Sequence, residues 1–247
     1  MKGVLSFAIG LSLLLAFLTA QPSPKPPGAV RVNPKDGLTY VWIPPGTFQM
    51  GCSPGDGDCS VQEKPPHQVT ITKGFWMGQT EVTQEAYRRV MGTNPSFDEG
   101  PKLPVESINW SDAKSYCEAV GMRLPTEAEW EYSARAGSTE SRYGDLDAVA
   151  WYNGNSPGRP QEVGGKQANA WGLHDMLGNV REWVADWYSD HYAPGNATDP
   201  VGQNNGTHRV NRGGSRFDAP KGVRASDRFR GDPEGHGPLN GVRCAGN

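Results

Sequence analysis

The chain has 247 residues, enough for one large domain or two small ones. Its 24 basic and 27 acidic residues nearly balance and form no basic stripe, which argues against nucleic acid as a partner. Glycine (32) and proline (21) are abundant, and eight tryptophans are spread along the chain. This composition is typical of a loop-rich globular domain rather than a disordered chain.

The N-terminus has the pattern of a secretory signal peptide. Lys2 supplies the positive charge, residues 4–18 form an apolar run, and Leu18-Thr19-Ala20 resembles a cleavage site. We therefore expect cleavage near Ala20 and export to the periplasm or the medium. The apolar run is too short for a comfortable membrane span, so the mature chain is expected to have none. We expect residues 1–20 to be the signal peptide, 21–37 a proline-rich linker and 38–247 one domain.

The four cysteines suit an oxidising compartment. Cys52 and Cys59 lie in one turn-rich loop, which favours a local disulfide. Pairing Cys117 with Cys244 would close a long loop, where the entropic model predicts the largest gain in stability. Four cysteines allow three connectivities, so the sequence leaves the pairing open.

Apolar alternation predicts strands at residues 38–42, 46–50 and 67–71, and another apolar segment begins at Phe75. Three short helices are expected next, each with one apolar face packed on the rest of the domain. Their expected N-caps are Thr83, Ser111 and Thr126, the last in a capping box with Glu129. After residue 138 regular structure thins out, with short strands expected at 209–215 and 241–244. The pattern indicates a single α+β domain with much ordered loop.

Residues 172–188 combine large apolar groups with a Gly178-Asn179 turn and three acids, Asp175, Glu182 and Asp186. Carboxylates and free turn carbonyls are the oxygen ligands that calcium prefers. The alternative is a hairpin in the core with solvated acids, because two flanking acids are few for a calcium loop. From spacing alone both interpretations remain open.

Seven segments, in order, resemble the formylglycine-generating enzyme family, also called the sulfatase-modifying factor domain. They are Trp42-Ile-Pro-Pro-Gly-Thr-Phe-Gln-Met-Gly51, Thr80-Glu-Val-Thr83, Pro104-Val-Glu-Ser-Ile-Asn-Trp-Ser-Asp-Ala113, Arg123-Leu-Pro-Thr-Glu-Ala-Glu-Trp-Glu131, Gly172-Leu-His-Asp-Met-Leu-Gly-Asn-Val-Arg-Glu-Trp183, Arg212-Gly-Gly-Ser215 and Gly241-Val-Arg-Cys244. The resemblance implies a compact variant of the C-type-lectin-like fold with little regular structure. It also implies a disulfide between Cys117 and Cys244.

The resemblance further implies a calcium site in residues 172–188. Its ligands would be the side chains of Asp175 and Glu182 and the backbone carbonyls of Gly178 and Val180. Asparagine is common in the family where Asp175 stands, and either side chain can bind calcium through oxygen. The ligands of a second calcium site, known in some members, are not matched in residues 149–171.

The chain departs from the family at the catalytic segment. Members that generate formylglycine oxidise a cysteine of a sulfatase with oxygen, using copper(I) held by two thiolates after the Gly-Gly-Ser motif. Here Asp218 stands at the first cysteine position, and the second cysteine is absent. Copper(I) selects soft thiolates, so copper-dependent formylglycine formation is not expected.

The remaining side chains of this segment predict a cleft that binds a peptide, a protein or a small anionic ligand. They are Ser215, Asp218, Arg224, Asp227 and Arg228. Arginine can hold a carboxylate or phosphate with two hydrogen bonds. One alternative is a structural ion-pair cluster in which the aspartates neutralise the arginines. The other is an oxidoreductase that uses a different metal, or none, in the same cleft.

Overall fold

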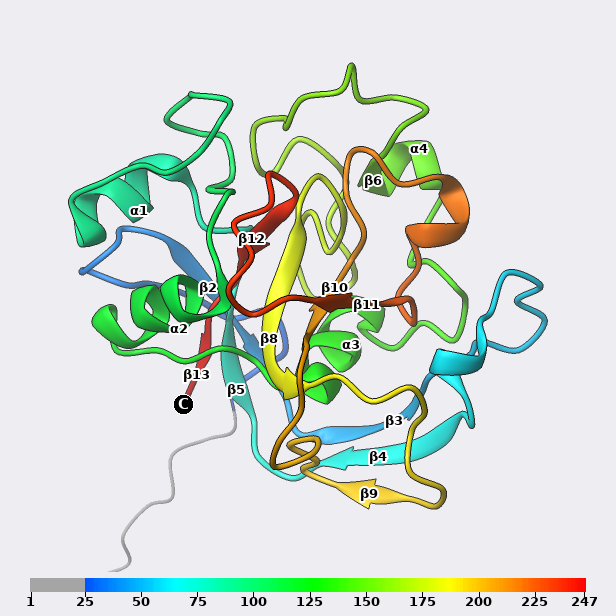
Figure 1. The fold of residues 1–247 in the computed structure, drawn as a ribbon. Helices are drawn as coiled ribbons and strands as arrows, with labels where there is room; N and C mark the ends of the chain where they lie inside the picture. The colour runs from blue at the N-terminus through cyan, green and yellow to red at the C-terminus, as the bar shows by residue number, and fades with distance from the viewer. Residues whose placement is uncertain (1–24) are drawn as a thin grey trace, which may run out of the picture.

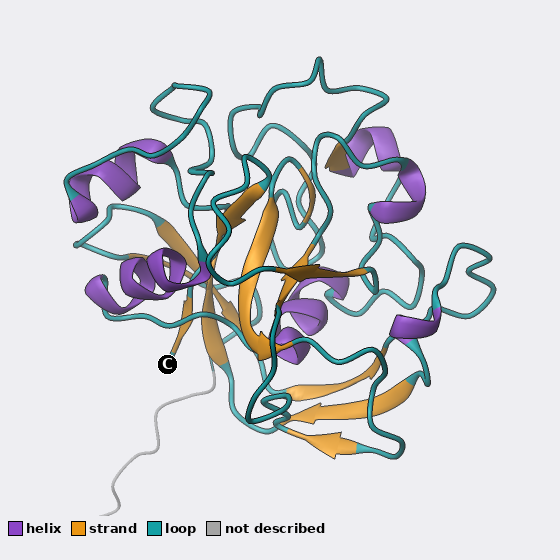
Figure 2. Cartoon of the chain, in the orientation of Figure 1, coloured by secondary structure: helices purple, strands orange, loops and turns teal. Residues whose placement is uncertain are grey.

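The computed structural model describes residues 25–247, so the expected signal peptide lies outside the described residues. Short strands in four sheets are joined by long ordered loops (Figures 1 and 2). The first sheet has the order β1 (Val30–Val32), β2 (Thr39–Ile43), β5 (Phe75–Gly78) and β13 (Ala245–Gly246). The second has β11 (Arg228–Gly231), β10 (Arg209–Arg212), β8 (Arg181–Trp187) and β12 (Asn240–Val242).

The third sheet contains β3 (Gly46–Met50), β4 (His67–Ile71) and β9 (Ala197–Thr198). In the fourth, β6 (Ala150–Trp151) pairs in parallel with β7 (Leu177–Gly178). The helices are α1 (Gln84–Met91), α2 (Trp110–Ala119), α3 (Glu127–Arg135) and α4 (Leu146–Val149), with 3-10 turns η1 (Val61–Glu63) and η2 (Pro220–Gly222). In residues 25–247 no helix is long and apolar enough to cross a bilayer.

Local capping explains where the helices begin. The hydroxyls of Thr83 and Thr126 accept hydrogen bonds from the third residue of α1 and α3, as expected. The expected cap Ser111 is wrong, because α2 begins at Trp110 and its N-cap is Asn109, two residues before Ser111. Asn109 accepts from the Asp112 N–H, and the Asp112 carboxylate accepts from the Asn109 N–H. This reciprocal pair satisfies two N–H groups that Ser111 would leave free.

Helix α3 is buried over nearly its whole circumference, although a single apolar stripe is expected from its sequence. Eight of its nine residues are buried, including Glu127, Glu131 and Arg135. The helix contacts β3, β8 and β10, so it lies between sheets rather than on one of them (Figure 1). Its charged residues are tolerated there because buried arginines of other elements pair with them.

The segment expected as a linker contributes to the fold. Val30–Val32 form β1, which pairs antiparallel with β2. Asp36 is buried and accepts hydrogen bonds from the hydroxyls of Tyr40 and Tyr116. The domain therefore starts before residue 38, because these contacts depend on partners distant in the sequence.

Two disulfides tie the loops together. Cys117 of α2 is joined to Cys244, across 127 residues, and Cys52 is joined to Cys59, across 7. Directly after Cys244, β13 pairs with the central strand β5, so the C-terminus is held both covalently and by the sheet. All four cysteines of the sequence are used in these two bonds.

Candidate functional site

The segment from Asp175 through the turn between β7 and β8 has an unusual backbone. Asp175, Gly178 and Asn179 all have positive φ angles (54°, 84° and 56°). A Cβ atom at Gly178 would lie 2.1 Å from the Trp151 carbonyl oxygen, so glycine alone fits there. The two strands lie in different sheets, and Asp175 and Glu182 are buried. The alternative of a hairpin with solvated acids is therefore wrong.

Glu182 already has strong partners inside the protein. Its carboxylate accepts hydrogen bonds from Trp130 Nε1 at 2.6 Å and from Arg243 Nη2 at 2.7 Å. Arg243 is fully buried and also donates to the carbonyls of Gly78, His174 and Asp175. No local pattern singles out Arg243. The parallel pairing of β12 with β8 brings it next to Glu182.

A third buried acid, Glu81, stands beside this turn, and sequence reasoning missed it. Its carboxylate accepts from Asn179 Nδ2 at 2.6 Å and from the Val180 N–H at 3.1 Å. Burial, together with the charges of Asp175 and Glu182, raises the pKa of Glu81 well above its usual range. The one available signal was its place in the Thr80-Glu-Val-Thr83 motif.

Only one of the two carboxylate oxygens of Asp175 has a hydrogen-bond partner among the described residues. Its Oδ2 accepts from the Gly164 N–H at 2.5 Å, whereas its buried Oδ1 has no hydrogen-bond partner in the described part of the chain. Burial raises the pKa of the Asp175 carboxyl. Three buried carboxylates thus surround one guanidinium, that of Arg243. Carboxylate oxygens are the ligand type that a hard cation binds, and a cation here would favour the ionised forms of Glu81 and Asp175, whose pKa values are raised. Any such cation would have to share Glu182 with Arg243.

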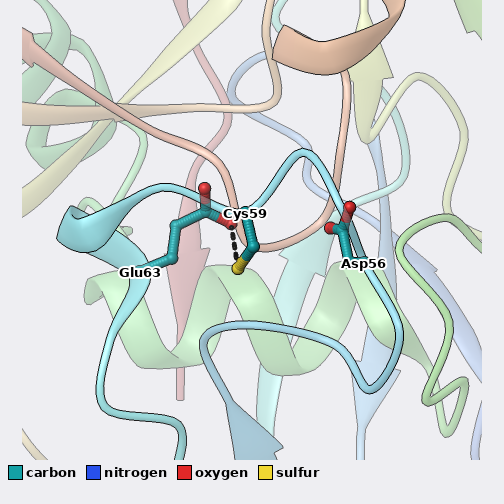
Figure 3. A group of neighbouring side chains, drawn as sticks. All are labelled: Asp56, Cys59 and Glu63. Atoms are coloured by element: carbon teal, nitrogen blue, oxygen red, sulfur yellow. Dashed lines mark hydrogen bonds between the residues drawn. The ribbon is translucent and has the colours of Figure 1, made fainter.

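The described residues contain one group of three side chains with candidate metal-ligand atoms within 4.8 Å of one another: Asp56, Cys59 and Glu63 (Figure 3). Cys59 Sγ lies 3.5 Å from Glu63 Oε2, but this sulfur is bonded to Cys52 and is no thiolate. Although burial opposes it, hydrogen bonds from Arg224 and Ser226 lower the pKa of Glu63 to about 2. The group is therefore an ion-pair cluster centred on Arg224, not a metal site.

The arginines of the predicted cleft both point into the protein. Arg224 donates to both carboxylate oxygens of Glu63, at 2.7 and 2.8 Å, and to Asp56 at 2.8 Å. Its contact with Asp227 is longer, at 3.4 Å, and burial raises the pKa of Asp227 to about 6. These distances favour the structural ion-pair interpretation for this arginine.

Arg228 belongs to a separate cluster. Its Nε and Nη2 donate to the two carboxylate oxygens of Glu127 at 2.5 and 2.8 Å, and its Nη1 donates to the carbonyls of Gln62 and Ser189. Arg224 and Arg228 are 2% and 7% exposed. A ligand anion would have to break buried ion pairs to reach either guanidinium, which is costly.

Ser215 and Asp218 form the third group. Asp218 Oδ2 accepts from the N–H and the hydroxyl of Ser215 at 2.8 and 2.7 Å, and Asp218 Oδ1 lies 2.7 Å from Arg181 Nη2. Arg181 also stacks on the Phe229 ring at 3.9 Å. The predicted cleft residues therefore divide into three clusters. Of these, the Ser215–Asp218 cluster lies beside an exposed aromatic side chain, Phe217.

Comparison with known proteins places this geometry in a family. Residues 27–247 match the family model of the sulfatase-modifying factor enzyme 1-like domain. The chain belongs to this family. PvdO of Pseudomonas aeruginosa has the same fold, with a TM-score of 0.81 and 30% identity, covering 91% of this chain and 100% of that one. The fold is thus the α+β, formylglycine-generating-enzyme-like variant of the C-type-lectin-like architecture.

Curated relatives of this sulfatase-modifying factor domain carry different names. The formylglycine-generating enzyme of Thermomonospora curvata is 32% identical over 253 residues, covering 90% of this chain and 76% of the enzyme. The chaperone protein LppX of Paenibacillus barcinonensis is 31% identical over 236 residues, covering 71% of this chain and 80% of LppX. Family membership therefore does not by itself decide between an oxidase and a binding protein.

Proposed function

We propose that this chain is an exported, calcium-stabilised member of the family that binds a peptide, a protein or a small anionic ligand. It does so without copper-dependent cysteine oxidation. The observation that carries the proposal is the use of all four cysteines in disulfides, with Asp218 of the catalytic segment paired to Arg181. A hard carboxylate engaged by a guanidinium is a poor substitute for the thiolate pair that copper(I) needs.

A partly aromatic surface beside Ser215 and Asp218 is the proposed binding face. Phe217 is 52% exposed and Phe97 is 83% exposed. The loop at residues 158–159 lies close to Phe217 and to Asp98, the neighbour of Phe97 in the sequence. A Cβ atom at Gly158 would lie 3.8 Å from the Phe217 ring, and Arg159 Nε lies 4.0 Å from Asp98 Oδ1. Exposed aromatics next to charged groups are the usual anchors of protein and peptide binding.

The relative LppX, named as a chaperone, favours a protein or peptide over a small anion as the ligand. Arg224 and Arg228, the arginines of the cleft predicted from the sequence, are engaged in buried ion pairs and are not free to bind a small anion. This also favours a protein or peptide ligand. Disulfides persist in oxidising compartments, so both bonds support export.

The alternative function, an oxidoreductase of the same family, is tested directly by turnover. The purified protein is loaded with copper(I) and incubated in air with a cysteine-containing sulfatase peptide, and the product mass is measured. The Thermomonospora curvata enzyme serves as positive control. We expect no conversion of cysteine to formylglycine and no copper retained after desalting. Conversion above the copper-only blank would overturn the proposal.

Binding is tested with a displayed library of random peptides selected on the purified protein. Enriched peptides are synthesised, and their affinity is measured by calorimetry against wild type, Phe217→Ser and Val61→Ser. Val61 is similarly exposed but lies in η1, outside the proposed face. We expect Phe217→Ser to weaken binding at least about tenfold and Val61→Ser to leave it unchanged. Equal loss in both variants, or no enriched peptide, contradicts the proposed face.

A further inference from the structure

A second concave site lies away from the Ser215–Asp218 cluster. It is a cavity of about 330 Å³ between the start of β4, the end of β8, the N-terminus of α3 and the loop from β8 to β9. That loop, yellow in Figure 1, leads from the end of β8 to β9 at the edge of the third sheet. Much of the wall is apolar, with Met50, Ala128, Trp187, Pro194 and Val201 among its residues.

Two acids at the end of the cavity have unequal partners. Glu127 is held by Arg228 through two hydrogen bonds and accepts a third from the Tyr192 hydroxyl. Asp186 is 4% exposed, and its Oδ2 accepts from the Glu127 N–H at 2.8 Å. Within residues 25–247 the Asp186 carboxylate forms no salt bridge, and Arg228 and Arg209 interact with it only at longer range.

The other carboxylate oxygen of Asp186, Oδ1, lies beside Gly202, and both residues line the cavity. A Cβ atom added at Gly202, a lining residue, would lie 2.7 Å from Asp186 Oδ1. No donor among the described residues reaches Oδ1, whereas Oδ2 is occupied by the first N–H of α3. Burial, and next the charge of Glu127, raises the pKa of Asp186 to about 7. A cation bound beside Oδ1 would stabilise the ionised form of Asp186 and so lower its pKa.

We propose that this cavity binds a primary ammonium group on a short aliphatic stem, with Asp186 as its counter-ion. A single free carboxylate oxygen matches the compact charge of an ammonium. A guanidinium prefers both oxygens of a carboxylate, and Asp186 Oδ2 is already engaged. A divalent metal ion needs more oxygen ligands than one. The apolar wall accepts the aliphatic stem of such a ligand. The rings of Trp187 and Tyr192 each already contact a guanidinium, those of Arg209 and Arg228, so the charge of the ligand is assigned to Asp186 alone.

Two sources present this chemistry, a free alkylamine and a lysine side chain of a peptide. Calorimetry with n-butylamine and with a short lysine peptide distinguishes them, and n-butanol and butyrate serve as neutral and anionic controls. We expect binding of the amine but of neither control. Binding of the lysine peptide as well assigns the site to a protein ligand, and its failure assigns it to small amines. No difference between butylamine and butanol overturns the proposal.

Substitutions locate the effect at Asp186. Asp186→Asn retains an oxygen for the Glu127 N–H but removes the charge, and we expect affinity for butylamine to fall at least about tenfold. Should this variant not fold, Val201→Trp at the exposed rim, 66% exposed, narrows the opening without touching Asp186. Val61→Trp, at the exposed turn η1, is its matched control. Unchanged affinity in a folded Asp186→Asn, or equal affinity in both tryptophan variants, overturns the site.

The pH dependence gives an independent check. The charged and titratable groups around Asp186 come from every neighbouring element: Glu127 and Glu129 of α3, Arg228 of β11, Arg209 of β10, His67 of β4, and His191 and Tyr192 of the loop. Below about pH 7 the Asp186 carboxylate gains a proton and loses the negative charge that would attract a cation. We expect about tenfold weaker binding at about pH 5.5 than at about pH 8.5. Equal affinity at the two values contradicts the assignment.

Discussion

Buried charged side chains in this chain are matched by partners from distant parts of the sequence. Arg212, Arg224, Arg228 and Arg243 are all buried, and each has a carboxylate within 2.8 Å. Sequence patterns place Arg224 and Arg228 in a ligand cleft because arginines near a catalytic segment commonly bind anions. The structure engages them with Glu63 and Glu127, which precede them by 161 and 101 residues. No local spacing predicts such pairs.

Breaking the Arg224 cluster should destabilise the fold. Arg224→Met leaves Glu63 buried and ionised without its main partner, and we expect the free energy of unfolding to fall by about 3–5 kcal/mol in urea. The exposed Arg89→Met, which removes a surface pair with Glu85, should cost less than about 1 kcal/mol. Equal losses in both variants would show that the buried pair has no special role.

Calcium binding at the turn is predicted to stabilise the protein. With calcium at about 100 times its dissociation constant, stability should rise by about 2.7 kcal/mol, which corresponds to about 5–10 °C in melting temperature. Chelation should remove this gain, measured by calorimetry. Asp175→Ala and Glu182→Gln should abolish it, whereas Asp175→Asn, which keeps an oxygen, should retain much of it. Identical melting curves with and without chelator would refute the site.

At the scale of elements, α3 illustrates what local rules predict. Thr126 and Glu129 form a capping box from residues three positions apart, so the start of the helix is readable in the sequence. Its burial on nearly all sides is not readable, since it depends on β3, β8 and β10. The N-terminus of α3 also receives Asp186 from β8, 59 residues away.

Asp186 at this helix terminus should make stability depend on pH. Its pKa is raised from 3.8 to about 7, so the folded state favours the protonated acid. This contribution is fully present below about pH 3.8 and is lost as pH rises through about 7. Asp186→Asn cannot ionise, so we expect it to gain stability relative to wild type between about pH 5 and 8. Urea unfolding of both proteins across this pH range measures the difference. If their free energies of unfolding change with pH in the same way, Asp186 does not contribute to the pH dependence of stability.

For the whole molecule, the two disulfides are expected to contribute unequally. The chain-entropy model gives about 5 kcal/mol for the 127-residue separation of Cys117 and Cys244, and about 2 kcal/mol for the 7-residue separation of Cys52 and Cys59. Replacing both cysteines of a pair by alanine and measuring urea unfolding tests this. A larger loss from the Cys52–Cys59 pair would indicate that packing around the bonds, rather than loop closure, dominates.

Sequence by itself determined the features that short stretches encode: the helix starts at Thr83 and Thr126, the strand at residues 67–71 and the tight turn at Gly178. The seven motifs, found in the order typical of the family, also predicted the family and its fold, because together they span most of the chain. Tertiary structure alone decided which charges meet. Glu81 and Arg243 lie beside the acids of the turn. Arg224 and Arg228 form buried ion pairs instead of lining the expected cleft, and Asp186 lines a cavity. The reason is that a buried charged side chain needs a partner nearby in space, and in this fold that partner comes from a distant part of the sequence. The spacing of residues along the chain does not reveal which side chains become neighbours.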